Sequence, residues 1–285
     1  MTKTRTTTTT TTTTRTTTSR MARAVRTAAI TAALTAGAAV AFPAAAHAAG
    51  ADHYYIEIGG TGATTHTPGC DTTTSSYNEA NAALQLGDHA IEVCYPATAG
   101  PFIGPNGPLI DLQTLQPHPD ALTAPNYDSS VRQGYQEALK AAQDTHRDHP
   151  DALITISGYS QGAQAADQVL QTIAAGGTGI PLSQVNGMLY ADPMQPGTGF
   201  TAQIPKGWGV PGFTSPGAGP AEFNGIPVTR YCIHGDPVCD ASLLNAPGYF
   251  NLHGNYPQRG NVIAQTLGDD GGDGILWRTP DGGPA

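Results

Sequence analysis

Residues 153–162 read Leu-Ile-Thr-Ile-Ser-Gly-Tyr-Ser-Gln-Gly, a mostly apolar run followed at once by a serine between two glycines. The apolar run predicts a buried β-strand, and the small residues at 162–170 predict a helix that packs closely against it. So tight a turn leaves no room for a side chain at Gly158 or Gly162, and it presents the Ser160 hydroxyl above the sheet edge. The bare pattern also occurs in structural Gly/Ser turns, but the strand–turn–helix context favours the nucleophile elbow of a serine hydrolase.

On both sides of this elbow the chain alternates between predicted strands and helices. We expect strands at 54–58, 90–95, 153–156, 188–190 and 228–231, and helices at 77–86, 129–146 and 162–170. Strands joined through helices imply an α/β three-layer sandwich with a central, mainly parallel sheet of about five strands. In such a sheet the active site lies at the carboxyl ends of the strands. Residues 99–126 and 197–225 form long apolar connections, either lids over the site or plain surface crossings.

The termini indicate an exported protein. Residues 1–20 are almost all threonine and should be disordered, or untranslated if synthesis begins at Met21. Residues 21–48 resemble a secretory signal peptide, with a basic start, an alanine-rich apolar stretch and a small-residue cleavage site. We therefore expect a secreted, extracellular protein with a catalytic domain over 49–267.

Residues 268–285 read as a solvated Gly- and Asp-rich tail. Its aspartates lack the closing glutamate of a calcium loop, so we expect no metal there.

Net charge excludes some partners. The chain has 22 acidic residues against 13 Lys and Arg, for a net charge of −9. Six of those basic residues and none of the acidic ones lie in residues 1–48, so the mature chain would carry −15. A strongly anionic protein is not drawn to nucleic acid or anionic lipid. We expect a monomer that binds no nucleic acid and is not an integral membrane protein.

Ser160 needs a histidine base and a carboxylate to orient it, and in α/β hydrolases these follow the serine in the order acid, then histidine. His253, in a Gly- and Asn-flanked loop, is the candidate base. His234 also follows the serine, but it lies two residues before the best acid. That acid is Asp236, just past the strand at 228–231. Asp192 and Asp240 remain alternatives for the acid.

Two main-chain segments are candidates for the oxyanion hole, the donors that stabilise the negative oxygen of a tetrahedral intermediate. Gln161 begins the helix after the elbow, so its main-chain N–H is free to donate. The glycine-rich turn at 59–62 follows the first strand, where the second donor of this fold arises, and Thr61 is the candidate there.

The elbow at 158–163 and the cysteine loop at 232–239, which contains Gly235 and Asp236, resemble those of cutinase-type serine esterases. The resemblance covers roughly 54–256, and it implies the triad Ser160, Asp236 and His253 with Thr61 and Gln161 as oxyanion donors. Two loops, at 95–97 and 191–193, are more similar to the PE-PPE hydrolase domain of actinobacteria. The chain also lacks a cysteine just before 150–152, where cutinases have another disulfide.

Four cysteines in an exported chain favour two disulfides. Of the three possible pairings we favour Cys232 with Cys239 and Cys70 with Cys94.

The predicted activity is hydrolysis of a carboxylic ester in a lipid, a polyester or an acylated glycan, through an acyl-enzyme and without a metal or other cofactor. An acyltransferase with the same triad, or a non-catalytic module that binds the cell envelope, are the alternatives.

Overall fold

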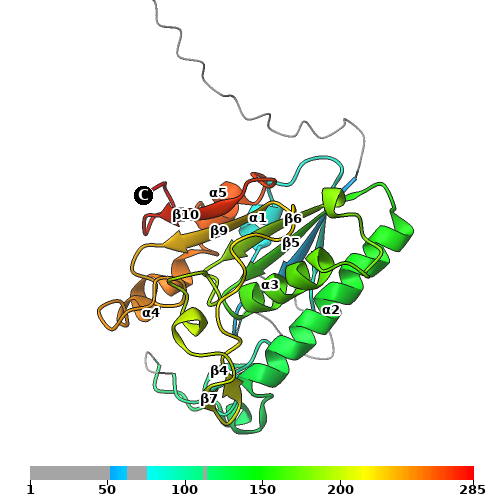
Figure 1. Ribbon diagram of the computed structural model, residues 1–285. Helices are drawn as coiled ribbons and strands as arrows, with labels where there is room; N and C mark the ends of the chain where they lie inside the picture. The colour runs from blue at the N-terminus through cyan, green and yellow to red at the C-terminus, as the bar shows by residue number, and fades with distance from the viewer. Residues whose placement is uncertain (1–51, 63–75, 112–113) are drawn as a thin grey trace, which may run out of the picture. The chain divides into compact units, whose positions relative to one another are not determined.

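The computed structural model describes residues 52–62, 76–111 and 114–285 (Figure 1). The predicted leader and signal peptide lie outside these ranges, as does Cys70. Within them, no helix is both long enough and apolar enough to cross a membrane.

Six strands form the central sheet in the order β10-β9-β6-β5-β1-β2, and every neighbouring pair is parallel. The strands are β1 (His53–Ile58), β2 (Asp88–Glu92), β5 (Leu153–Tyr159), β6 (Val185–Tyr190), β9 (Val228–Ile233) and β10 (Gly274–Arg278). β1, β6 and β9 are buried at every position, as expected where helices cover both faces of a parallel sheet. The predicted α/β sandwich is confirmed.

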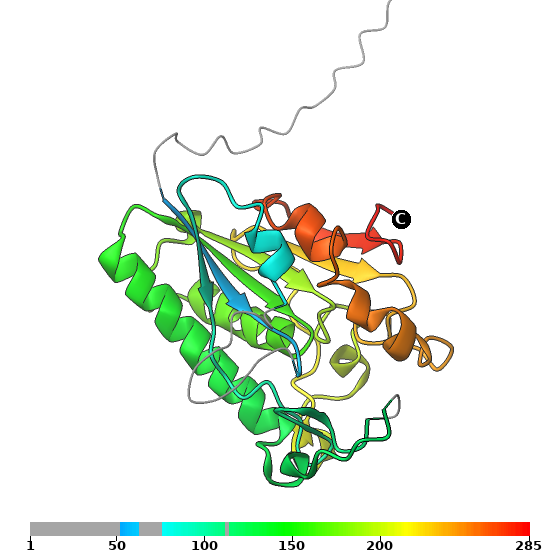
Figure 2. The ribbon, with the colours of Figure 1, turned by 180° about the vertical axis from the view of Figure 1, so that it is seen from behind.

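Helices cover the two faces of the sheet separately. In Figure 1, α2 (Tyr127–Asp148) and α3 (Gln161–Ala174) lie over one face, and Figure 2 shows α1 (Asn78–Asn81) and α5 (Val262–Thr266) over the other. Along β1 the side chains alternate between the two cores: Ile56 and Ile58 pack toward α2 and α3, and Tyr55 packs with α1 and α5. This alternation produces three layers.

The register of the sheet brings four strand ends to one edge. Ile58 pairs with Gly158, and Tyr190 pairs with both Tyr159 and Tyr231. The residues that follow β1, β5, β6 and β9 therefore emerge side by side, at the edge where ligands bind in such sheets.

The helices differ from their predicted lengths. The helix expected at 77–86 is only the single turn α1. The side chain of Tyr77, which precedes the turn, makes no capping hydrogen bond, and Leu86 is fully exposed. Helix α2 begins two residues earlier than predicted, because the side chain of Asn126 accepts a hydrogen bond from the Ser129 N–H at 2.9 Å.

The interpretation of the C-terminal stretch as a solvated tail is wrong. β10 is paired with β9, and it is the sixth strand that the sequence analysis missed. The carboxylate of Asp270 accepts hydrogen bonds from Thr155 at 2.8 Å and Asn186 at 2.9 Å, and it lies 3.1 Å from the His53 imidazole. Burial would raise the pKa of Asp270, but these partners, His53 first, outweigh it and hold the pKa at about 2. The C-terminal stretch is thus held to the sheet both by the pairing of β10 and by the side-chain contacts of Asp270.

The two long connections each contain a small antiparallel hairpin. The first holds β3 (Ile103–Gly104), β4 (Gly107–Pro108) and the 3-10 helix η2 (Pro119–Thr123). The second holds η4 (Thr201–Gln203), β7 (Gly209–Val210) and β8 (Phe213–Thr214). The remaining elements are η3 (Leu182–Gln184), α4 (Gly248–Asn251) and η5 (His253–Asn255). The second connection packs on the start of α2, where the Tyr127 and Phe213 rings meet edge to face.

Candidate active site

The turn between β5 and α3 has the geometry that its two glycines predict. Ser160 has φ 56° and ψ −118°, a left-handed backbone conformation that a residue with a side chain adopts only under constraint. A Cβ at Gly158 would lie 2.4 Å from the Gly162 carbonyl oxygen, and one at Gly162 would lie 2.0 Å from the carbonyl oxygen of Ile58. Only glycine fits at either position, so the pattern of the elbow is a steric requirement.

The structure brings Ser160, His253 and Asp236 together in one hydrogen-bonded chain. The Oγ of Ser160 lies 2.8 Å from Nε2 of His253, and Nδ1 of His253 lies 2.9 Å from Oδ2 and 3.2 Å from Oδ1 of Asp236. Asp236 is completely buried, whereas Ser160 and His253 keep 8% and 7% of their surface exposed. An imidazole that contacts a serine hydroxyl through one nitrogen and a carboxylate through the other is the arrangement that activates a serine.

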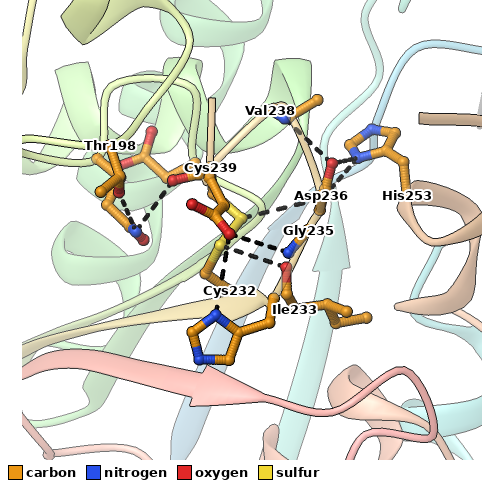
Figure 3. The surroundings of a disulfide bond; sticks show 12 residues. Thr198, Cys232, Ile233, Gly235, Asp236, Val238, Cys239 and His253 are labelled. Atoms are coloured by element: carbon orange, nitrogen blue, oxygen red, sulfur yellow. Dashed lines mark hydrogen bonds and ion pairs between the residues drawn. A yellow bond between two sulfur atoms is a disulfide. The ribbon is translucent and has the colours of Figure 1, made fainter. Parts of the chain in front are cut away.

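A short covalent ring holds Asp236 (Figure 3). Cys232 at the end of β9 and Cys239 form a disulfide across seven residues, as predicted. Within this ring the N–H of Val238 donates to Oδ1 of Asp236 at 3.1 Å, and the N–H of Asp236 donates to the Ile233 carbonyl at 3.0 Å. The carboxylate therefore has a fixed orientation toward His253. The other predicted pair, Cys70 with Cys94, includes a residue outside the described ranges.

Two tyrosines that the sequence analysis did not assign to the site hold His253. The hydroxyl of Tyr159 donates to the main-chain carbonyl of His253, and the two rings stack with centroids 5.3 Å apart. Tyr249, in α4, stacks on the same imidazole at 5.0 Å and 14°. The sequence did contain a signal for Tyr159. Successive residues of a strand face opposite sides of the sheet, so the residue directly before Ser160 lies on the face opposite to that of Gly158, which packs against α3.

The alternative candidates have other partners. His234 is mostly exposed and stacks on the ring of Trp277 at 4.4 Å. The carboxylate of Asp240 accepts a hydrogen bond from the Gly235 N–H at 2.9 Å. Asp192 accepts one from the Arg230 guanidinium at 2.9 Å.

Asp192 belongs to a buried charge cluster that the sequence analysis missed. Arg230 also contacts Asp167 at 2.7 Å, and it donates to the carbonyl of Pro220 in the second long connection. Burial, together with the neighbouring charge of Asp192, raises the pKa of Asp167 to about 7, although Arg230 opposes this. Burial also raises the pKa of Asp192. The cluster ties the 197–225 connection to the carboxyl edge of the sheet.

The two segments that carry the predicted oxyanion donors lie next to Ser160. Gln161 is the first residue of α3, where main-chain N–H groups lack partners within the helix. The loop at 59–62 passes directly beside the elbow, since a Cβ at Gly60 would lie 3.1 Å from the Cβ of Ser160. Thr61 follows in this loop and is half-buried.

Across residues 52–62, 76–111 and 114–285, no three His, Cys, Asp or Glu side chains gather in a way that could hold a metal ion.

Comparisons with known proteins identify the family of this chain. The family model of cutinases matches residues 55–266. The catalytic core domain of acetyl xylan esterase from Trichoderma reesei is 22% identical, with 73% of this chain and 92% of that chain covered and a TM-score of 0.46. A cutinase-like protein from Cryptococcus sp. is 18% identical, with coverages of 76% and 91% and a TM-score of 0.47. Lysin B from Mycobacteriophage D29 is 18% identical, with coverages of 76% and 81% and a TM-score of 0.43. No curated protein sequence matches significantly. Because the family match spans well over half of the chain, the protein belongs to the cutinase family and is a carboxylic ester hydrolase.

Proposed function

We propose that this hydrolase works through a catalytic triad in which Ser160 is the nucleophile, His253 the general base and Asp236 the acid. The observation that carries the proposal is the unbroken chain of contacts at 2.8 Å and 2.9 Å from the elbow serine to the buried carboxylate. Asp236 holds the imidazole in the tautomer that can accept the serine proton, and it stabilises the imidazolium that results.

The reaction then follows from the positions of these groups. His253 removes the proton of Ser160 as Oγ attacks the ester carbonyl carbon, and the electron pair of the broken C=O π bond moves to oxygen. The N–H of Gln161 and a donor of Thr61 stabilise this oxyanion. The electron pair of the oxyanion then re-forms the C=O bond, the C–O bond to the alcohol breaks, His253 protonates the departing alcohol, and an acyl-serine remains. Water, deprotonated by His253, attacks the carbonyl carbon of the acyl-serine. The bond between this carbon and Oγ then breaks, His253 returns the proton to Ser160, and the acid is released.

Replacement of Ser160 by alanine tests the triad. We expect Ser160→Ala to lower kcat for a p-nitrophenyl ester by about 10⁴-fold or more with the fold intact, and to abolish labelling by a fluorophosphonate. Ser157→Ala is a matched control, since Ser157 lies in the same strand but donates its hydroxyl to Tyr77. Near-normal hydrolysis by Ser160→Ala would eliminate the triad, and a wild-type protein that is neither labelled nor active would favour the non-catalytic alternative.

The segment between Asp236 and His253 supports an apolar substrate. Leu243, Leu244 and Phe250 are 96%, 91% and 79% exposed, and Phe250 follows the tyrosine that stacks on His253. Exposed apolar side chains in the segment that joins the proposed acid to the proposed base are candidates for a surface that binds an apolar ligand. We therefore favour a lipid or polyester over an acylated glycan. Rates on p-nitrophenyl esters should rise from acetate to longer acyl chains, and a maximum at acetate would contradict this preference.

The products distinguish hydrolysis from acyl transfer. A hydrolase releases free acid in the presence of sugar or lipid alcohols, whereas an acyltransferase forms a new ester with them. Mass spectrometry of the products measures which occurs, and we expect free acid.

We also propose that the protein is exported. A disulfide between Cys232 and Cys239 suits an oxidising compartment, and residues 21–48 have the sequence of a signal peptide. N-terminal sequencing of protein recovered from the culture medium should begin near Ala49. Retention of the whole chain inside the cell would contradict export.

A further inference from the structure

The loop that carries Thr61 is held in place by the segment at 97–98. The N–H of Gly62 donates to the carbonyl of Ala97 at 2.7 Å, so Thr61 is adjacent to this attachment. Ala97 is completely buried and has φ 50°, a conformation that costs free energy in a residue other than glycine. The position of the predicted second oxyanion donor therefore depends on what keeps Ala97 in this strained conformation, and Thr98 is the next residue along the chain.

Three buried groups form a closed ring of hydrogen bonds around Thr98. The side-chain amide of Gln161 donates to the Thr98 carbonyl at 2.9 Å, and the Thr98 N–H donates to Oγ of Ser130 at 3.0 Å. The Ser130 hydroxyl closes the ring by donating to Oε1 of Gln161 at 3.0 Å. All three residues are at most 1% exposed. Each bond determines the direction of the next, because the amide of Gln161 cannot flip without placing its oxygen against the Thr98 carbonyl.

Gln161 thus serves both halves of the oxyanion hole. Its main chain offers the first donor, and its side chain holds the loop on which the second donor depends. We propose that Ser130, through the side chain of Gln161 and the backbone of Thr98, is a positioning residue that keeps the two oxyanion donors at a fixed separation. This inference rests on the proposed ester-hydrolysis mechanism at Ser160.

Removing the Ser130 hydroxyl should weaken stabilisation of the transition state and leave substrate binding nearly unchanged. An oxyanion forms only after Ser160 attacks, so donors that are misplaced by a fraction of an ångström lower kcat and not ground-state affinity. For Ser130→Ala we expect kcat on p-nitrophenyl butyrate to fall roughly tenfold to hundredfold with KM within about twofold of wild type. The inhibition constant of an alkyl trifluoromethyl ketone, whose serine adduct carries an oxyanion, should rise in proportion to the loss of kcat/KM.

The matched control is Tyr135→Phe. The hydroxyl of Tyr135 also bridges α2 to α3, through Thr172 at 3.0 Å, but it belongs to no part of the ring at Thr98. The Tyr135→Phe variant should change the melting temperature without changing kcat or inhibition by the ketone. If Ser130→Ala does not fold, Gln161→Met keeps the main-chain N–H and the side-chain volume, and it should show the same kinetic pattern.

The outcomes separate this inference from the mechanism beneath it. If Ser160→Ala abolishes hydrolysis but Ser130→Ala and Gln161→Met behave like Tyr135→Phe, the positioning role is wrong and the triad stands. A rise in KM with unchanged kcat would also overturn it. If Ser160→Ala itself retains activity, the proposed function fails first.

Discussion

At the scale of single residues, the histidine of the proposed triad is held more firmly than a loop residue would be alone. Its imidazole contacts Ser160 and Asp236, while Tyr159 binds its main chain and stacks on its ring. A general base must keep its nitrogen aligned with the serine hydroxyl throughout the reaction. Tyr159 therefore contributes to the alignment of the imidazole.

Tyr159→Phe should lower kcat/KM by roughly tenfold, because the ring still stacks but the main chain of His253 loses its anchor. It should also lower the free energy of unfolding by about 1 kcal/mol, the usual net value of a hydrogen bond. Steady-state kinetics and urea unfolding measure the two effects. Tyr190→Phe is the control, since its hydroxyl pairs with Thr266 elsewhere on the same face of the sheet. Equal kinetic losses in both variants would refute a specific role for Tyr159.

At the scale of elements, the loop after β9 combines a covalent ring with the proposed acid. Closing only a short stretch of chain removes little entropy from the unfolded state, so the disulfide should stabilise the fold by an amount near the low end of ~2–4 kcal/mol. Its greater effect is on the position of Asp236, whose carboxylate lies inside the ring.

Changing Cys232 and Cys239 together to serine should therefore reduce kcat by about 10²-fold while lowering the melting temperature only modestly. The second pair predicted from the sequence, Cys70 and Cys94, supplies the comparison, and its double variant should lose melting temperature more than kcat. Kinetics at a temperature where both variants are folded, with calorimetry alongside, decide the matter. Parallel losses of stability and activity in both would show that the ring has no positional role.

At the scale of the whole molecule, a buried carboxyl in the central sheet links stability to pH. Glu57 is completely buried in β1, and the side chain of Asn81 donates to its Oε2 at 2.8 Å. Its Oε1 has no partner in the described part of the chain, which suits a protonated carboxyl. Burial raises the pKa of Glu57 from 4.5 to about 8, with the Asn81 hydrogen bond opposing the shift and the charge of Glu92 adding to it.

The sign of the pH effect follows from this raised pKa. Between pH 4.5 and about 8 the folded protein keeps a proton that the unfolded chain releases, so the contribution of Glu57 to stability is lost as pH rises through this window. Glu57→Gln cannot release a proton, and it should flatten this part of the stability profile, becoming more stable than wild type above pH 8 by an amount on the order of a few kcal/mol. Urea unfolding across the window measures the difference. Wild-type and variant profiles that run parallel would mean that Glu57 is ionised in the folded protein.

Local sequence was sufficient for the elements whose signal lies within a few residues. The elbow needs glycine at 158 and 162 because main-chain atoms occupy the space of a Cβ, and this constraint is visible in the sequence itself. The alternation of apolar strands and helices likewise predicted the parallel sheet, since burial on both faces requires near-continuous apolar strands. The order of serine, acid and histidine narrowed the proposed triad to a few residues.

Contacts between distant segments decided what remained. His253 and Ser160 are 93 positions apart, and the ring of Ser130, Gln161 and Thr98 joins three separate elements. Neither leaves a periodic pattern, because a single hydrogen-bonding side chain is compatible with many local sequences. The strand β10 was missed for the same reason: its short apolar run becomes a strand only because the edge of β9 is available to pair with it.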